Sequence, residues 1–169
     1  MTVIDVATNS ENLTLTLTAQ FAAPPERVWQ VWSDPRQLEL WWGPPTWPAT
    51  FVDHDFVVDG LASYYMTGPA GEKAHGWWRF LALDEPLSLE FEDGFSHDDG
   101  RPDDGMPVVR ARVALTGTDD GTVMTVTSTY GSAEQMERLV AMGMVEGMAG
   151  AAGQIDVVLA GGIPEQPDC

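Results

Sequence analysis

The sequence predicts a single α+β domain in which a long C-terminal helix covers an antiparallel β-sheet. Three observations support this prediction. Apolar residues alternate with threonines over residues 13–21, six further strand patterns follow between residues 50 and 130, and apolar residues recur at threes and fours over 132–159. A sheet of this size must cover its apolar face, and only the last segment forms a helix long enough to do so. We expect one domain over residues 1–169, with its core at about 12–160 and short flexible termini.

The first strand pattern leads into two short helices. Leucines at positions 13, 15 and 17 alternate with threonines, which is typical of a half-buried strand ending near Phe21. Pro24 and Pro25 suit the start of a helix, because the first turn needs no amide donors. Asp34-Pro35 interrupts that helix, and a second short helix over 36–42 stops at Gly43-Pro44-Pro45.

The middle of the chain predicts consecutive antiparallel strands separated by turn sequences such as Asp59-Gly60 and Asp84-Glu85-Pro86. Apolar residues at odd positions from 109 to 115 alternate with arginines at 110 and 112, as in a sheet with one buried face. The stretch 94–107, GFSHDDGRPDDGMP, predicts a polar, mobile loop. The expected strands cover residues 50–57, 61–67, 72–83, 87–92, 108–116 and 122–130.

The last segment predicts one amphipathic helix. Ser132 can cap its N-terminus, and Gly161-Gly162 with Pro164 ends it. Four glycines lie inside this segment, and each costs up to about 1 kcal/mol relative to alanine in a helix interior. Glycines that face the sheet leave room either for a ligand or for close helix–sheet packing, and the sequence leaves both open. The glycines are Gly143, Gly147, Gly150 and Gly153.

Charge and composition narrow the classes of partner. The chain has 26 acidic and 8 basic residues, a formal net charge of −18, so we expect neither nucleic acid nor an anionic membrane as a partner. The acid-rich stretch 84–104 is interpreted as a solvated surface rather than a docking patch. The single cysteine, Cys169, cannot form an intrachain disulfide, and the N-terminus lacks the pattern of a secretory signal. We therefore expect a cytoplasmic protein, as a monomer or homodimer.

An unusual concentration of tryptophan lies in WSDPRQLELWWGPPTWP, which holds four of the seven tryptophans around a turn of glycine and prolines. These rings either plug the end of the core or wall a cavity, and the two interpretations overlap because a packed rim also bounds a pocket. Methionines elsewhere add side chains that adapt to ligands of variable shape. The residues expected to wall a cavity are Trp41, Trp42, Trp47, Tyr64, Met66, Trp78, Phe80, Phe91, Met124, Gly143, Met144, Gly147 and Met148.

No metal, cofactor or catalytic site can be named from the residue patterns. In a strand, Asp53 and Asp55 share one face while His54 points away, which is poor geometry for a metal. His75 is interpreted as structural, and the loop 96–104 fails the spacing of a calcium loop. The chain has no phosphate-binding loop or dinucleotide fingerprint, so we expect no cofactor.

Several segments together resemble the SRPBCC superfamily, which includes START domains. They are FAAPPERVWQVWSDPRQLELWWGP, FVDHDFVVDG, MTGPAGEKAHG, LSLEF and MVEGMAGAAGQIDVVLA. Within it they are similar to the branch named after the C-terminal domain of the heat-shock protein 90 ATPase activator, over residues 13–159. The resemblance implies the helix-grip fold, a curved antiparallel sheet around a long C-terminal helix with a cavity between them. Ala62, Met148 and Ala152 stand where the family usually has bulkier residues, which removes bulk from positions expected near the cavity.

Three functions follow as hypotheses. The favoured one is binding of a small, mostly hydrophobic molecule between the sheet and the last helix, because no polar constellation stands out in the sequence. A polyketide-cyclase-like or hydrolase-like enzyme is the alternative, and it needs a buried acid or base beside open space. A chaperone-interaction module is implied only by the resemblance and would have a filled core.

Overall fold

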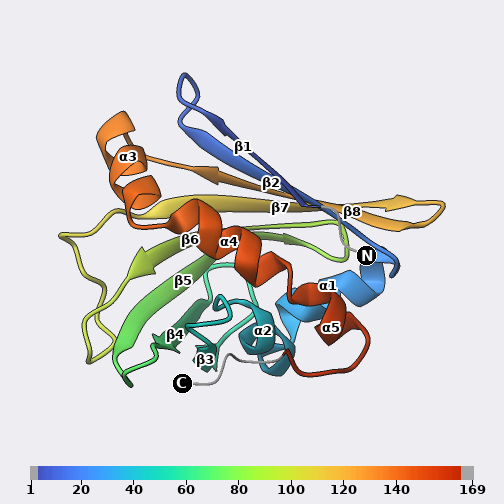
Figure 1. Ribbon diagram of the computed structural model, residues 1–169, viewed down its shortest axis with the longest axis horizontal. Coiled ribbons are helices and arrows are strands. Elements are labelled where there is room, and N and C mark those ends of the chain that lie inside the picture. The colour runs from blue at the N-terminus through green and yellow to red at the C-terminus, as the bar shows by residue number, and fades with distance from the viewer. Residues whose placement is uncertain (1–3, 165–169) are drawn as a thin grey trace.

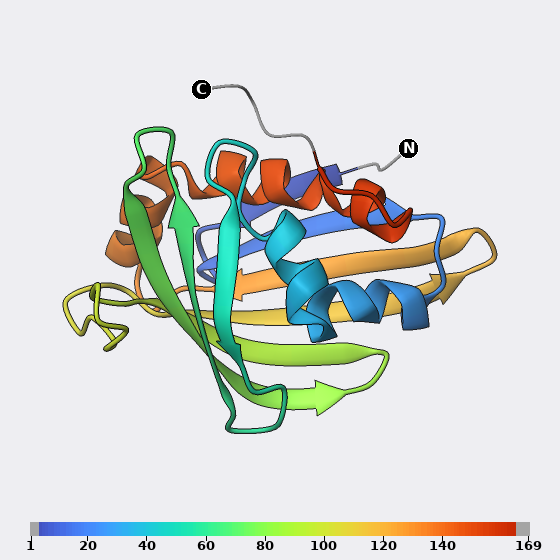
Figure 2. The same cartoon turned by 90° about the horizontal axis from the view of Figure 1, so that it is seen from below.

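The strands of the computed structural model, which describes residues 4–164, form one eight-stranded antiparallel sheet. Their order across the sheet is β1-β2-β8-β7-β6-β5-β4-β3. The sheet curves, and the helices lie against its inner side (Figure 1 and Figure 2). The strands are β1 (Ile4–Asn9), β2 (Thr14–Phe21), β3 (Ala49–His54), β4 (Leu61–Thr67), β5 (Lys73–Asp84), β6 (Ser88–Phe95), β7 (Val109–Thr118) and β8 (Gly121–Thr129). This is the predicted helix-grip α+β fold.

The strand β1 was not among the predicted strands. It pairs antiparallel with β2, from Ile4 opposite Ala19 to Asn9 opposite Thr14. Because β1 is an edge strand whose side chains are mostly exposed, its sequence carries little of the apolar alternation that marks a half-buried strand. Leu13, expected inside the first strand, instead lies in the β1–β2 turn with a φ of 56°.

The two short helices follow β2 as expected, as α1 (Pro25–Ser33) and α2 (Pro35–Trp41). Asp34 separates them and caps α2, because its carboxylate accepts a hydrogen bond of 3.0 Å from the backbone nitrogen of Arg36. The buried face of α1 carries Val28, Trp29, Val31 and Trp32. These side chains place the first tryptophans of the chain in the core.

The C-terminal segment is divided into three helices, where the sequence predicts one. They are α3 (Ala133–Ala141), α4 (Met144–Ala152) and α5 (Ile155–Leu159). Gly143 has a φ of 89°, a left-handed conformation that ends α3, and the backbone turns again at Gly153 and Gln154. The break lets α4 lie across the sheet while α3 points away at one end (Figure 1).

The core between the sheet and α1 and α2 is dominated by aromatic rings. Trp32 packs edge-on against Trp41, with ring centroids 4.7 Å apart, and Trp78 stacks on Phe91 at 4.1 Å. Aromatic pairs of this kind stabilise a core beyond the area that they bury. None of the helices within residues 4–164 has both the length and the apolar character needed to cross a membrane.

Candidate ligand-binding cavity

A cavity of about 470 Å³ lies between the sheet and α4. Its wall is built by the inner faces of β2, β4, β5, β6, β7 and β8, by α1, by the end of α2 with the turn that follows it, and by α3 and α4. The lining is mainly aromatic and aliphatic, with a few polar side chains. The site therefore joins segments from both halves of the chain.

Most of the residues predicted to wall a cavity are brought together around it. Two are not: Trp78 and Phe80 are fully buried behind the wall. Trp42 covers Trp78, with ring centroids 4.7 Å apart at 87°, and Phe80 packs against Phe56. The residues that line the cavity are Trp41, Trp42, Trp47, Tyr64, Met66, Phe91, Met124, Gly143, Met144, Gly147 and Met148.

The tryptophan-rich turn both seals the core and borders the cavity. Trp41 is 3% exposed, and its Nε1 donates a hydrogen bond of 2.9 Å to the carbonyl oxygen of Val31. The buried Gln154 holds the turn from the other side, because its Nε2 donates to the carbonyl oxygen of Gly43 at 2.7 Å. Gly43 has no room for a side chain, since a Cβ would collide with the carbonyl oxygen of Trp47. The contribution of Gln154 was missed because nothing in the sequence separates it from an exposed helical glutamine.

The helix glycines have two different roles. Gly143 and Gly147 line the cavity, and a Cβ added at Gly147 would meet no atom within 4 Å. Gly150 faces the turn instead, where an added Cβ would lie 3.4 Å from Cδ of Pro45. Gly147 thus leaves open space, whereas Gly150 allows α4 to pack closely on the turn.

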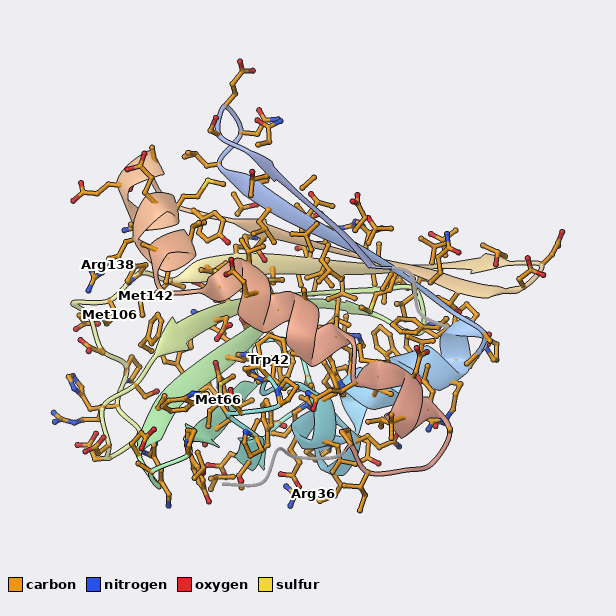
Figure 3. The ribbon with its side chains drawn as sticks, viewed as in Figure 1. Arg36, Trp42, Met66, Met106, Arg138 and Met142 are labelled. Carbon is orange, nitrogen blue, oxygen red and sulfur yellow. The ribbon has the colours of Figure 1, made fainter. Side chains whose placement is uncertain are left out.

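One end of the cavity lies where α3 meets the loop between β6 and β7. Met142 lines the cavity yet is 57% exposed, so solvent reaches this point. Figure 3 shows Met142 and Arg138 beside Met106, and Nη2 of Arg138 lies 3.2 Å from Sδ of Met106. Trp42 and Met66 lie below α4 in the same view.

An ionisable pair interrupts the apolar wall. The Tyr64 hydroxyl of β4 donates a hydrogen bond of 2.9 Å to Oδ1 of Asp93 on β6, and both residues line the cavity. Burial raises the pKa of Asp93 to about 7, although the hydrogen bond from Tyr64 opposes this shift. Burial and the neighbouring Asp93 also raise the pKa of Tyr64 well above its usual range. The site can therefore hold a carboxyl group that gains or loses a proton near neutral pH.

Asp93 was missed because the strand was expected to end at Glu92. The observed β6 continues to Phe95, which places Asp93 on the inner face with Leu89 and Phe91. The alternation of Leu89, Phe91, Asp93 and Phe95 was the available signal, because an acid at a core-facing position of a strand is uncommon. It was instead counted among the acids of a solvated surface.

The other histidine and aspartate candidates lie apart from this pair or at its margin. His54 stacks on Phe56 with ring centroids 5.3 Å apart, and burial lowers its pKa. Asp53 accepts a hydrogen bond from the Ser63 hydroxyl at 3.0 Å. His75 lines the cavity. Within residues 4–164, no group of three or more histidine, cysteine, aspartate or glutamate side chains is arranged to hold a metal ion.

Comparison with known sequences agrees with this architecture. Residues 22–160 match the family described as activator of Hsp90 ATPase homolog 1-like protein. The chain belongs to this family. No curated protein matches the sequence significantly.

Solved structures extend the family relationship to close homologues. A protein from Arthrobacter aurescens is 50% identical, with a TM-score of 0.90 over 96% of this chain and 93% of its own. A protein from Mycobacterium smegmatis is 47% identical, with a TM-score of 0.86 over 93% of this chain and 97% of its own. A protein from Rhodobacter sphaeroides, 24% identical, shares the fold with a TM-score of 0.80 over 94% and 99% of the two chains. The family departures at Met148 and Ala152 lie on the cavity wall, whereas Ala62 is buried beside Trp78.

Proposed function

We propose that this protein binds a small, mostly hydrophobic molecule in the cavity between the sheet and α4. The observation that carries the proposal is the cavity itself, about 470 Å³ in volume and walled by aromatic rings and methionines. Ligand sites in proteins commonly have volumes of about 300–1,000 Å³ and are lined mostly by apolar side chains. An apolar ligand gains about 25 cal/mol for each Å² of apolar surface that it buries.

The composition of the wall supports binding over simple structural packing. An unfilled apolar cavity lowers the stability of a fold, by about 24 cal/mol for each Å³ in one measured series. Gly147 adds a further cost, because glycine is unfavourable inside a helix. Both costs are offset when a ligand occupies the space. Met124, Met144 and Met148 provide flexible thioether side chains that can adapt to its shape.

A substitution whose side chain occupies the cavity tests this function. We expect the neutral dye N-phenyl-1-naphthylamine to bind with a rise in fluorescence, and Gly147→Leu to weaken binding at least ~10-fold, or ~1.4 kcal/mol. Glu146→Leu is the matched control, because it adds the same side chain at an exposed position of the same helix. Equal dye affinity in folded Gly147→Leu and wild-type protein would refute binding in this cavity.

A second candidate, acid–base catalysis in the same cavity, is favoured by one observation. The carboxyl group of Asp93 lines the cavity and has its pKa raised to about 7, which suits proton transfer near neutral pH. Native mass spectrometry of the purified protein would identify a co-purified compound. If catalysis is the function, the compound that co-purifies with Asp93→Asn should be converted when wild-type protein is added. The open cavity speaks against the chaperone-interaction module, for which a filled core is expected.

A further inference from the structure

Asp93 has no positively charged partner among residues 4–164. Its hydrogen-bond donor is the neutral Tyr64 hydroxyl, and Asp93 forms no ion pair with any residue from 4 to 164. An ionised carboxylate in apolar surroundings is unfavourable unless a counter-charge accompanies it. The cavity wall therefore holds a carboxyl group for which residues 4–164 offer no counter-charge, and a positively charged ligand would supply one.

Aromatic rings surround the same space. Trp42, Tyr64, Phe91 and Phe95 line the cavity together with Asp93. Trp42 lies edge-on to Tyr64 and to Phe91, with both ring centroids 6.3 Å away. The faces of such rings attract cations, and weakly hydrated quaternary ammonium groups are recognised in this way. A carboxylate and aromatic rings on the wall of one cavity provide two kinds of attraction for a positive nitrogen.

The charges elsewhere favour the same sign of ligand. Besides Asp93, the titratable groups that line the cavity are Tyr64 and His75, while the lining residues of β7, β8, α3 and α4 are neutral. The formal net charge of −18 attracts cations towards the protein and repels anions. An apolar acid would meet repulsion both outside and inside the cavity.

We propose that the cavity selects apolar molecules that carry one positively charged nitrogen, an amine or a quaternary ammonium group, which pairs with Asp93 inside the aromatic wall. This inference rests on the proposed binding function and specifies the class of its ligand. The apolar part of the molecule contacts the methionines and α4, and the nitrogen lies beside the carboxylate.

Two probes of the same shape test the proposal. Benzyltrimethylammonium carries a fixed positive charge, and 2,2-dimethylpropylbenzene replaces its nitrogen with carbon. At pH 8, calorimetry or NMR titration should show that wild-type protein binds the cation at least ~10-fold more tightly than the neutral probe. Asp93→Asn should abolish this preference. Glu92→Gln should retain it, because Glu92 precedes Asp93 on β6 but does not line the cavity.

A pH series with wild-type protein provides a second measurement. The charge of the probe is fixed, so its affinity follows the ionisation of Asp93, whose pKa is raised to about 7 by burial. Affinity for the cation should rise ~10-fold from pH 6 to pH 8, and affinity for the neutral probe should stay constant. The series is repeated with His75→Asn, because His75 also lines the cavity. The rise should persist in that variant.

The outcomes separate this inference from the binding function on which it rests. If the neutral probe binds as tightly as the cation, or if Asp93→Asn keeps the preference for the cation, the inference is wrong and the binding function stands. If neither probe binds, both proposals fail. A pH dependence that vanishes in His75→Asn would likewise overturn the role of Asp93.

Discussion

The hydroxyl of Tyr64 reaches Asp93 across an intervening strand. Tyr64 is on β4 and Asp93 is on β6, and the 2.9 Å hydrogen bond between them passes over β5. Gly76 of β5 is the register partner of Tyr64, and a Cβ at this position would collide with the tyrosine ring. The absence of a side chain at Gly76 therefore allows two strands that are not neighbours to share one polar contact inside the cavity wall.

Gly76→Ala should displace the Tyr64 ring and break this contact. The expected loss of stability is about 1–3 kcal/mol, as for other substitutions that overfill a packed core. Denaturant unfolding measures the change. Gly147→Ala is the control, because its Cβ enters open space and alanine favours the helix by up to about 1 kcal/mol. Equal stability of Gly76→Ala and wild-type protein would contradict the role assigned to this glycine.

Asp93→Asn should change how stability depends on pH. Burial raises the pKa of Asp93 from 3.8 to about 7, so the folded wild-type protein holds a proton that the unfolded chain releases. The resulting stability is fully present below about pH 4 and is lost as pH rises towards 7. Relative to wild type, Asp93→Asn should therefore gain stability across this range, on the order of 4 kcal/mol at most. Urea unfolding at pH 5, 6, 7 and 8 measures this gain, and parallel curves for the two proteins would contradict it.

Tyr64→Phe should raise the pKa of Asp93 above its wild-type value. The Tyr64 hydroxyl stabilises the ionised carboxylate by donating a hydrogen bond, and its removal leaves burial less opposed. Carbon-13 NMR of the aspartate carboxyl groups follows the titration directly. If the pKa of Asp93 falls or stays the same in a folded Tyr64→Phe variant, the hydrogen bond does not stabilise the ionised carboxylate.

Gln154→Ala should loosen the tryptophan-rich turn. It removes the amide that donates to the carbonyl oxygens of Gly43 and Trp41 at 2.7 and 3.3 Å. Loss of a buried hydrogen-bond partner costs about 1–3 kcal/mol, and thermal unfolding measures it. Gln20→Ala, at an exposed position of β2, is the control and should stay within about 0.5 kcal/mol of wild type. If both variants unfold alike, Gln154 does not anchor the turn.

Local patterns determined most of the fold. The alternation in β7 and the prolines at the start of α1 depend only on neighbouring residues. The bounds of β7 and the start of α1 were therefore predicted closely. The edge strand β1 was missed because its pairing with β2 leaves most of its side chains exposed. The breaks in the C-terminal helix were missed because an apolar period continues through Gly143 even though its backbone turns left-handed.

The sequence by itself determined that aromatic, methionine and glycine residues would gather between the sheet and the last helix, since their periods place them on the inner faces. Only the tertiary structure decided which of them border open space. Trp78 has the same alternation as Tyr64, yet Trp42 covers it from a distant turn. Asp93 lies in the cavity wall because β6 runs on to Phe95 and Gly76 lets Tyr64 reach across β5. Such placements depend on contacts between segments far apart in the chain, and the periodicity of a single element carries no information about them.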